Sequence, residues 1–236
     1  MLRTDANADS VSESAPNTRQ SMRPLTMPEQ IAENITDAVL RGEYKPGDRV
    51  REQDLAEQYQ VSRGPIREAL RILEKSGLVR IVPQRGAHIT QLSVKEVSDM
   101  FEIRRVLAGL LARSLCPAPA SLIKALDTEV SKIESLIGRK DGLNEHAKAS
   151  VRISRLMFEA CKNRQLVEMM ESLVNQTVRY TRLGLAEVQR RRESAADWRA
   201  FVTALDAGDA DLAATVLEGL IEASRLAAMK QLQQTG

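Results

Sequence analysis

The fold of this chain is decided by residues 52–90, EQDLAEQYQVSRGPIREALRILEKSGLVRIVPQRGAHIT. Apolar residues at helical spacing predict a short helix over residues 52–59 and a second helix over 63–76, which Gly77 ends. The second helix follows Ser62, whose hydroxyl is suited to accept a hydrogen bond from a free amide of the first helical turn. Two helices joined by so short a break are the central part of a helix-turn-helix.

The flanking segments complete a winged helix-turn-helix. Upstream, residues 27–41 place apolar side chains on one helical face until Gly42 and predict a first helix. Downstream, β-branched segments at 78–82 and 87–90 flank a Pro-Gln-Arg-Gly turn and predict a hairpin. Three helices followed by a hairpin wing form a DNA-binding domain, which we expect over residues 28–91.

The second helix of the motif has one apolar and one basic face. Leu70 and Leu73 help to close a small core, whereas Arg63, Arg67 and the basic residues after them recur every four residues on the opposite side. Such a row alone is more often a solvated helix face, but here a predicted hairpin lies beside it. Because arginine is the commonest reader of guanine, we expect Arg63 and Arg67 to contact base edges.

The composition limits the class of protein. Of 236 residues, 43% are hydrophobic and 3% aromatic, which allows packed cores and favours helices. A net charge of +2 is too small to indicate nucleic-acid binding by itself. No apolar run approaches the ~20 residues of a membrane helix. Cys116 and Cys161 form no zinc or disulfide pattern. We therefore expect a cytoplasmic protein with reduced thiols and no membrane partner.

The ends of the DNA-binding domain adjoin two different regions. Residues 1–27 are polar and lack apolar periodicity, which predicts a disordered arm. Residues 92–232 predict an all-helical domain, opened by the capping-box pattern of Ser93 and Glu96. Its further helices are expected at about 121–137, 143–161, 164–187, 192–206 and 209–230. The expected fold is therefore mostly α: an N-terminal winged helix-turn-helix (three helices plus a β-hairpin wing) followed by a six-helix antiparallel bundle.

The N-terminal region resembles the GntR family of bacterial regulators. The resemblance covers about residues 30–90 and is carried by Lys45–Val50, Leu55-Ala56, Val61–Arg63, Ile66–Leu70, Leu73, Gly77–Val79 and Arg85-Gly86. It implies that the helix over 63–76 lies in the major groove of operator DNA, with further side chains on phosphates. The residues expected at the DNA are Arg51, Ser62, Arg63, Gly64, Pro65, Arg67, Arg71, Lys75, Arg85 and Gly86.

Two positions depart from that family pattern. Gln60 stands where the family usually has glycine, so a left-handed backbone there would carry strain on the order of 1 kcal/mol. Gln53 stands where some relatives have a DNA-contacting arginine, which predicts a weaker contact or none.

The helical region resembles the FCD effector domain of the FadR subfamily. Arg104 near its start, Asn163 after its third helix and Ala207-Gly208-Asp209 before its last helix carry this resemblance. Many FCD domains hold a divalent metal ion through one aspartate and three histidines, but this chain has Ser150, Ser154, Trp198 and Leu220 at the corresponding positions. Because none supplies an imidazole or carboxylate, we expect no metal cofactor.

Without a metal ion, an anionic effector needs other partners, and arginine is the best bidentate one. The residues expected at the effector are Arg104, Ser150, Ser154, Arg155, Arg179 and Trp198. Each has a plainer interpretation, since the arginines suit salt bridges and Trp198 suits a core. His146 is expected on a solvated face, and His88 at most at a phosphate or the minor groove.

The sequence therefore predicts a homodimeric, ligand-responsive transcriptional regulator, a repressor of a metabolic operon that binds double-stranded operator DNA and a small organic acid. One alternative is a DNA-binding regulator whose helical domain is degenerate and senses nothing. Another is an enzyme, which we disfavour because no nucleophile–base set, metal cluster or phosphate loop stands out.

Overall fold

The computed structural model describes residues 24–139 and 141–235, so most of the predicted arm at 1–27 lies outside the described residues. The helices are α1 (Met27–Arg41), α2 (Glu52–Tyr59), α3 (Arg63–Lys75), α4 (Val94–Leu115), α5 (Ala120–Ser135), α6 (Gly142–Ala160), α7 (Arg164–Gly184), α8 (Val188–Asp206) and α9 (Ala210–Thr235). The strands are β1 (Arg49–Val50), β2 (Val79–Val82) and β3 (Gly86–Ile89). The order of elements confirms the predicted fold class.

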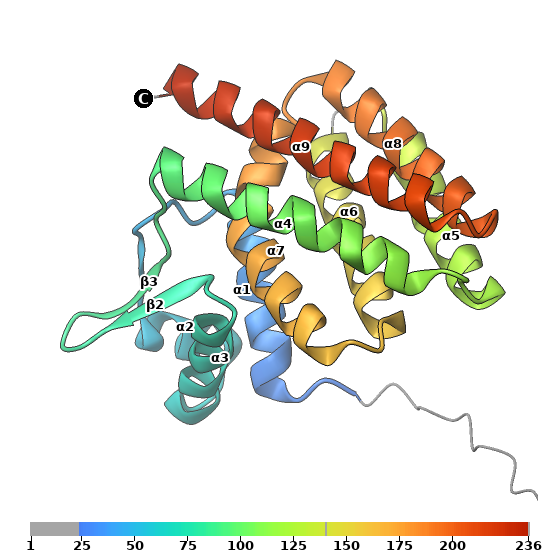
Figure 1. Cartoon of the computed structure of the whole chain (residues 1–236). Helices are drawn as coiled ribbons and strands as arrows, with labels where there is room; N and C mark the ends of the chain where they lie inside the picture. Colours follow the sequence, from blue (N-terminus) through green and yellow to red (C-terminus); the bar gives the residue numbers. More distant parts are fainter. Residues whose placement is uncertain (1–23, 140, 236) are drawn as a thin grey trace, which may run out of the picture.

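The molecule is built around two hydrophobic cores. Figure 1 shows α1–α3 and the small sheet on one side and the helices α4–α9 on the other, with α4 and α9 side by side. The smaller core is formed by apolar side chains of α1–α3 and one face of the sheet, and the larger by α4–α9. No helix among the described residues is both long and apolar enough to cross a membrane.

The wing has one more strand than the predicted hairpin. Strand β1 pairs antiparallel with β3, so the sheet has the order β1-β3-β2. A two-residue strand carries too little periodicity to be recognised in sequence. Val50, Ala87 and Ile89 of the sheet are buried against the helices, which fixes which face of the wing points outward.

The residues at three helix ends test the predicted caps and turns. Ser93 and Glu96 form the predicted capping box of α4, with the amide of Glu96 donating to the Ser93 hydroxyl. Ser62 does occupy the N-cap position of α3, but its side chain makes no capping hydrogen bond, contrary to expectation. Gln60 adopts the left-handed conformation, with φ 53°. The predicted strain therefore lies in the turn between α2 and α3.

The helical domain has the predicted helices with different bounds at several ends, including α9, which runs to Thr235 rather than to about 230. Helix α7 ends at Gly184 rather than near 187, and α8 begins at Val188 rather than near 192. Residues 188–191 were left between two predicted helices, yet Arg190 and Arg191 are buried inside the first turns of α8. Burial by neighbouring helices thus extends a helix through residues whose sequence pattern is polar.

Candidate DNA-binding surface and effector site

Helix α3 exposes the predicted basic row and buries its opposite face. Arg63, Arg67, Arg71 and Lys75 are all exposed. Ile66, Ala69, Leu70 and Leu73 are buried with at most 3% of their surface exposed. The buried face holds the helix rigidly on the small core, so the cationic side chains project from a fixed base. This arrangement can present guanidinium groups to a groove or to phosphates.

Two of these arginines have acidic neighbours within the same domain. Nε of Arg67 donates to Oε2 of Glu52 at 2.9 Å, and Arg71 lies 3.8 Å from Glu68. The Arg67 side chain remains 62% exposed, so the ion pair is solvated and weak. Arg67 can therefore exchange the carboxylate of Glu52 for another acceptor at low cost.

The tip and outer face of the wing carry further positive charge. Arg85 and Gly86 are exposed at the tip, and Gly86 has φ +84°, a conformation that favours glycine. The sheet register places Arg49 of β1 and Arg80 of β2 directly opposite His88 of β3. Sequence reasoning missed Arg49, because the partnership of β1 with β3 was needed to bring it to the wing.

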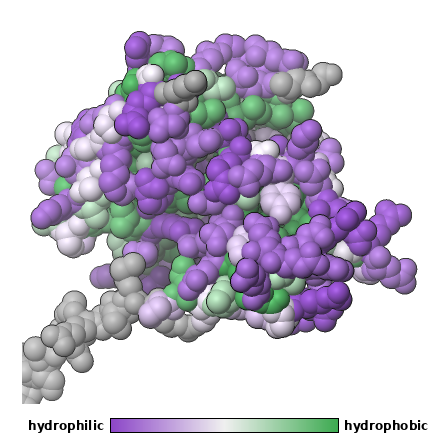
Figure 2. All heavy atoms as spheres, turned by 180° about the vertical axis from the view of Figure 1, so that it is seen from behind, coloured by the Kyte–Doolittle hydropathy of each residue, from purple (hydrophilic) through white to green (hydrophobic). Residues whose placement is uncertain are grey.

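The remaining predicted DNA residues lie at the start of the two helices of the motif. Arg51 immediately precedes α2, and Ser62 precedes α3, with Gly64 and Pro65 in its first turn. Arg51, Ser62 and Gly64 are exposed, and Pro65 is half-buried. The rear view in Figure 2 shows a mostly hydrophilic surface with hydrophobic residues in small, separate patches.

Inside the helical domain, Arg104 is buried without an acidic partner. Its Nη1 donates to the hydroxyls of Thr177 at 3.1 Å and Thr181 at 3.3 Å, and its guanidinium lies 5.7 Å from the ring centre of Phe101. Its Nε has no hydrogen-bond partner. Burial lowers the pKa of Arg104 to about 10, so the group stays cationic at neutral pH. It was predicted to face an effector.

A second buried polar cluster joins α6 to α8, and the sequence did not reveal it. His146, which was expected on a solvated face, is fully buried, and its Nε2 lies 3.2 Å from the hydroxyl oxygen of Ser194. Burial, and then the charges of Arg191 and Arg190, lower the pKa of His146 to about 4. The prediction of a solvated face was wrong because α8 packs against this side of α6 and covers the ring. We call His146, Arg190, Arg191 and Ser194 the α6–α8 cluster.

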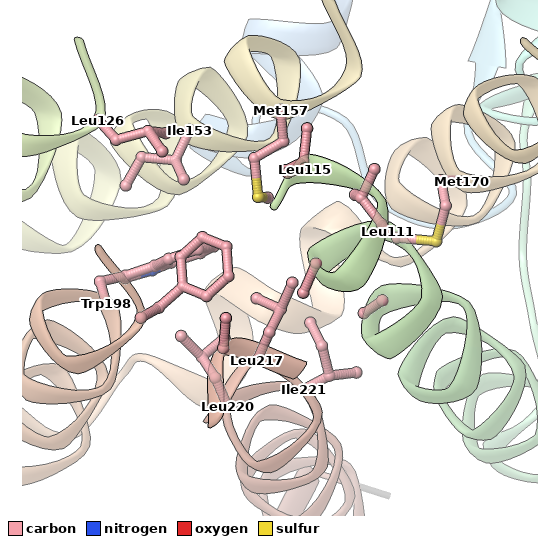
Figure 3. Packing of buried hydrophobic residues seen from close by; sticks show 14 of the residues in the cluster. Leu111, Leu115, Leu126, Ile153, Met157, Met170, Trp198, Leu217, Leu220 and Ile221 are labelled. Atoms are coloured by element: carbon pink, nitrogen blue, oxygen red, sulfur yellow. The ribbon is translucent and has the colours of Figure 1, made fainter. Parts of the chain in front are cut away.

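The serines and the tryptophan predicted at the effector are buried on α6 and α8, the same two helices that carry the α6–α8 cluster. The hydroxyls of Ser150 and Ser154 donate to carbonyls one turn earlier in α6, those of His146 and Ser150. The Trp198 ring meets Phe201 edge-on at 6.0 Å and lies in the large core with Leu220 of α9 (Figure 3). Trp198 therefore packs as a core residue, and its Nε1 has no hydrogen-bond partner.

These residues do not fit the divalent metal ion that the fold implies. Hydroxyls already committed to backbone carbonyls, an indole and a leucine provide none of the imidazole or carboxylate ligands that such an ion needs. Within residues 24–139 and 141–235, no group of three or more histidine, cysteine or acidic side chains is placed to hold a metal ion.

Two arginines predicted at the effector lie instead at the boundary between the two domains. Arg155 is 52% exposed, and its Nη1 contacts Oε1 of Glu33 in α1 at 2.7 Å. The guanidinium of Arg179 lies 5.3 Å from the ring centre of Tyr180 and interacts electrostatically with Asp48, which precedes β1. Contact of either side chain with an effector stays a prediction.

Comparison with known families and structures agrees with this architecture. The family described as "Bacterial regulatory proteins, gntR family" matches residues 28–89, and the FCD domain family matches residues 99–223. The transcriptional regulator YdhC of Bacillus subtilis is 30% identical over 155 residues, which are 65% of this chain and 69% of that protein.

A second relative and a solved structure cover more of the chain. The "Probable D-xylose utilization operon transcriptional repressor" of Paenarthrobacter nicotinovorans is 28% identical over 199 residues, 83% of this chain and 86% of that protein. The structure of E. coli McbR/YncC has a TM-score of 0.76 at 19% identity and covers 90% of this chain and all of that one. At that identity, the structural likeness concerns the fold.

Proposed function

The chain belongs to the GntR family of bacterial transcriptional regulators and carries an FCD domain, and we propose that it represses a metabolic operon from the cytoplasm in response to a small organic acid. We assign operator binding to residues 28–91 and effector binding with dimerisation to residues 92–232. A related protein named as a D-xylose operon repressor supports the sign of regulation. Its relatives are transcription regulators rather than enzymes.

The observation that carries the operator-binding role is the exposed basic row on α3. Arg63 and Arg67 lie in the first two turns of a helix anchored by its buried face, which is where a groove-bound helix meets base edges. Arg71, Lys75 and the wing residues Arg85 and Gly86 lie further along the same cationic surface and suit phosphates or the minor groove.

We further propose that the regulator is a homodimer formed through α4 and α9. Ile103, Val106 and Leu110 of α4 are about half exposed or more and recur on one face of that helix. They adjoin a groove of about 780 Å³ between α4 and α9. The groove rim contains both signs of charge, including Glu102, Arg105, Glu218, Glu222 and Arg225. A patch with both signs can pair with its own copy across a two-fold axis.

Operator selection tests the proposed function directly. Genomic fragments retained by the full chain are sequenced, and binding to a recovered fragment is compared with binding to a scrambled one at fixed salt. We expect a fragment with two related half-sites about one helical turn apart, as a symmetric dimer requires. Equal retention of scrambled DNA would contradict specific operator binding.

The dimer is tested by one substitution in the exposed apolar face. Val106→Glu places a carboxylate where two copies would meet, while the exposed Val188→Glu on α8 is a matched control. Sedimentation velocity should show a dimer for the original chain and the control but a monomer for Val106→Glu. A dimer in all three would place the interface elsewhere.

A further inference from the structure

We propose that the centre of the helical domain is an anion site in place of a metal site: Arg190, Arg191 and His146 bind a carboxylate or phosphate group of the effector directly. This inference rests on the proposed ligand response, and it names the chemistry of that ligand. In a metal-containing FCD domain a cation meets acidic and imidazole ligands. Here the α6–α8 cluster, which lies one helical turn before Ser150 on α6 and one to two turns before Trp198 on α8, holds guanidinium groups.

The geometry brings these groups to one face of α8 and one face of α6. Ser194 follows Arg190 by four residues and Arg191 by three, so all three share a helix face. His146 of α6 reaches that face through its 3.2 Å contact with the Ser194 hydroxyl. The side chains of the α6–α8 cluster are each at least nine-tenths buried.

The cluster has more buried polar nitrogens than the protein satisfies. All three guanidinium nitrogens of Arg190, Nε of Arg191 and Nδ1 of His146 are buried without a hydrogen-bond partner. Buried polar groups in folded proteins are almost always paired, because an unpaired one loses its hydration without compensation. So many nitrogens without partners in one place indicate that a ligand with several acceptor oxygens supplies the missing hydrogen bonds.

The charge balance of the cluster selects an anion. Arg190 and Arg191 contribute two positive charges, of which Asp197 balances one: its Oδ2 forms an ion pair with Nη1 of Arg190 at 3.5 Å, and the Asp197 side chain is 37% exposed. The low pKa of His146 keeps its ring neutral at physiological pH. A buried excess of positive charge repels a divalent cation and attracts a carboxylate or phosphate.

One arginine is fixed in place while the other is available. Nη1 of Arg191 donates to the carbonyl oxygens of Leu185 and Ala186, at 2.8 and 2.9 Å, and so caps the end of α7. Arg190 makes no such bond. A planar carboxylate can accept two parallel hydrogen bonds from the Arg190 guanidinium, the strongest pairing open to this group. Arg190 is therefore the main anion-binding residue, and Arg191 positions the site.

The test is thermal unfolding of the full chain with citrate, inorganic phosphate or the uncharged control glycerol, for the original protein, Arg190→Met and Arg192→Met. Arg192 is exposed two residues further along α8 and is the matched control. We expect at least one anion to raise the midpoint by about 5–10 °C at about 100 times its Kd. Arg192→Met should retain that rise and Arg190→Met should lose it. General salt stabilisation is common to all three proteins and cancels in the comparison.

The anion-free midpoints add a readout that a purely structural Arg190 would not give. Arg190→Met removes a buried guanidinium that has no hydrogen bond and leaves Asp197, which is 37% exposed, to be solvated, so the midpoint should change little. If Arg190→Met does not fold, Arg190→Lys retains the charge and should bind the anion about tenfold more weakly. Equal rises in all variants, no rise with either anion, or one equivalent of zinc, nickel or manganese bound in the purified protein would overturn the proposal.

Operator binding is measured on the same samples to separate the two proposals. A protein that binds its selected fragment but shows no anion effect refutes the anion site and leaves the regulator intact. A protein that binds anions but no specific DNA contradicts the proposed function instead.

Discussion

Helix α3 and helix α8 both carry arginines, but in opposite environments. Arg63 and Arg67 on α3 are exposed, and Arg67 has a solvated carboxylate beside it. Arg190 and Arg191 on α8 are buried, and Arg190 has no hydrogen bond at all. The exposed pair on α3 loses its hydration only when DNA binds, whereas the buried pair on α8 has already lost its hydration on folding. Removing an arginine of α3 should thus weaken DNA binding, whereas removing Arg190 of α8 should weaken anion binding and change the unfolding midpoint little.

Acid should destabilise the protein through the buried His146 of the helical domain, and this is the largest effect expected. His146, with its pKa lowered from 6.5 to about 4, takes up a proton in the unfolded chain below pH 6.5 but in the folded chain only below about pH 4. The contribution of His146 to the free energy of unfolding is complete above pH 6.5 and is lost as the pH falls to 4, a loss of about 3 kcal/mol. Urea titrations of the full chain at pH 7 and pH 5 should show about 2 kcal/mol of this loss.

Two histidine variants isolate this acid effect. His146→Gln should lose most of the stability difference between pH 7 and pH 5, since the buried ionisable ring is gone. His88→Gln, which alters the half-buried histidine of the wing, should keep that difference. An unchanged difference in His146→Gln would assign the acid effect to other groups.

Truncating the exposed arginines should weaken operator binding without unfolding the protein. Arg63→Ala or Arg67→Ala is expected to cost about 1–3 kcal/mol at the operator and to relax base preference. Arg71→Ala should weaken operator and scrambled DNA alike, because a phosphate contact carries no sequence information. Gel shifts on both DNAs at fixed salt check this. Equal losses on both DNAs for Arg67→Ala would show that Arg67 does not read bases.

The turn between α2 and α3 should be improved by a single glycine. Gln60 has φ 53°, which costs a non-glycine residue on the order of 1 kcal/mol. Gln60→Gly should therefore raise the free energy of unfolding by up to about 1 kcal/mol, less what glycine loses in chain entropy. Gln58→Gly, inside α2, is the control and should lower stability. A loss of stability in Gln60→Gly would mean that this turn is unstrained.

The contact between the two regions should contribute least. Arg155 pairs with Glu33 at 2.7 Å and Lys148 with Asp37 at 3.3 Å, both across the boundary between α6 and α1. These partly exposed pairs are worth about 0.2–1 kcal/mol each. Glu33→Gln should change the unfolding midpoint little and reduce its salt dependence, as measured by thermal scans at low and high salt. A large drop would show that this pair holds the two domains together.

Much of the fold could be predicted because its signals are local. The capping box of Ser93 and Glu96, the stop at Gly77 and the apolar face of α3 each depend on neighbours within a few residues, and the structure shows all three. The outward row on α3 follows from the same periodicity. Strand β1 escaped prediction, because its pairing with β3 joins residues about forty positions apart.

The amino-acid sequence by itself determined the winged helix-turn-helix, the helical domain and the family, since helical period, caps and turns act over short range. Only the tertiary structure decided that Arg155 and Arg179 lie at the domain boundary and that His146, Arg190 and Arg191 meet inside the bundle. The physical reason is that desolvation depends on which helices pack together. A charged residue has the same sequence pattern on a wet face as on a buried one.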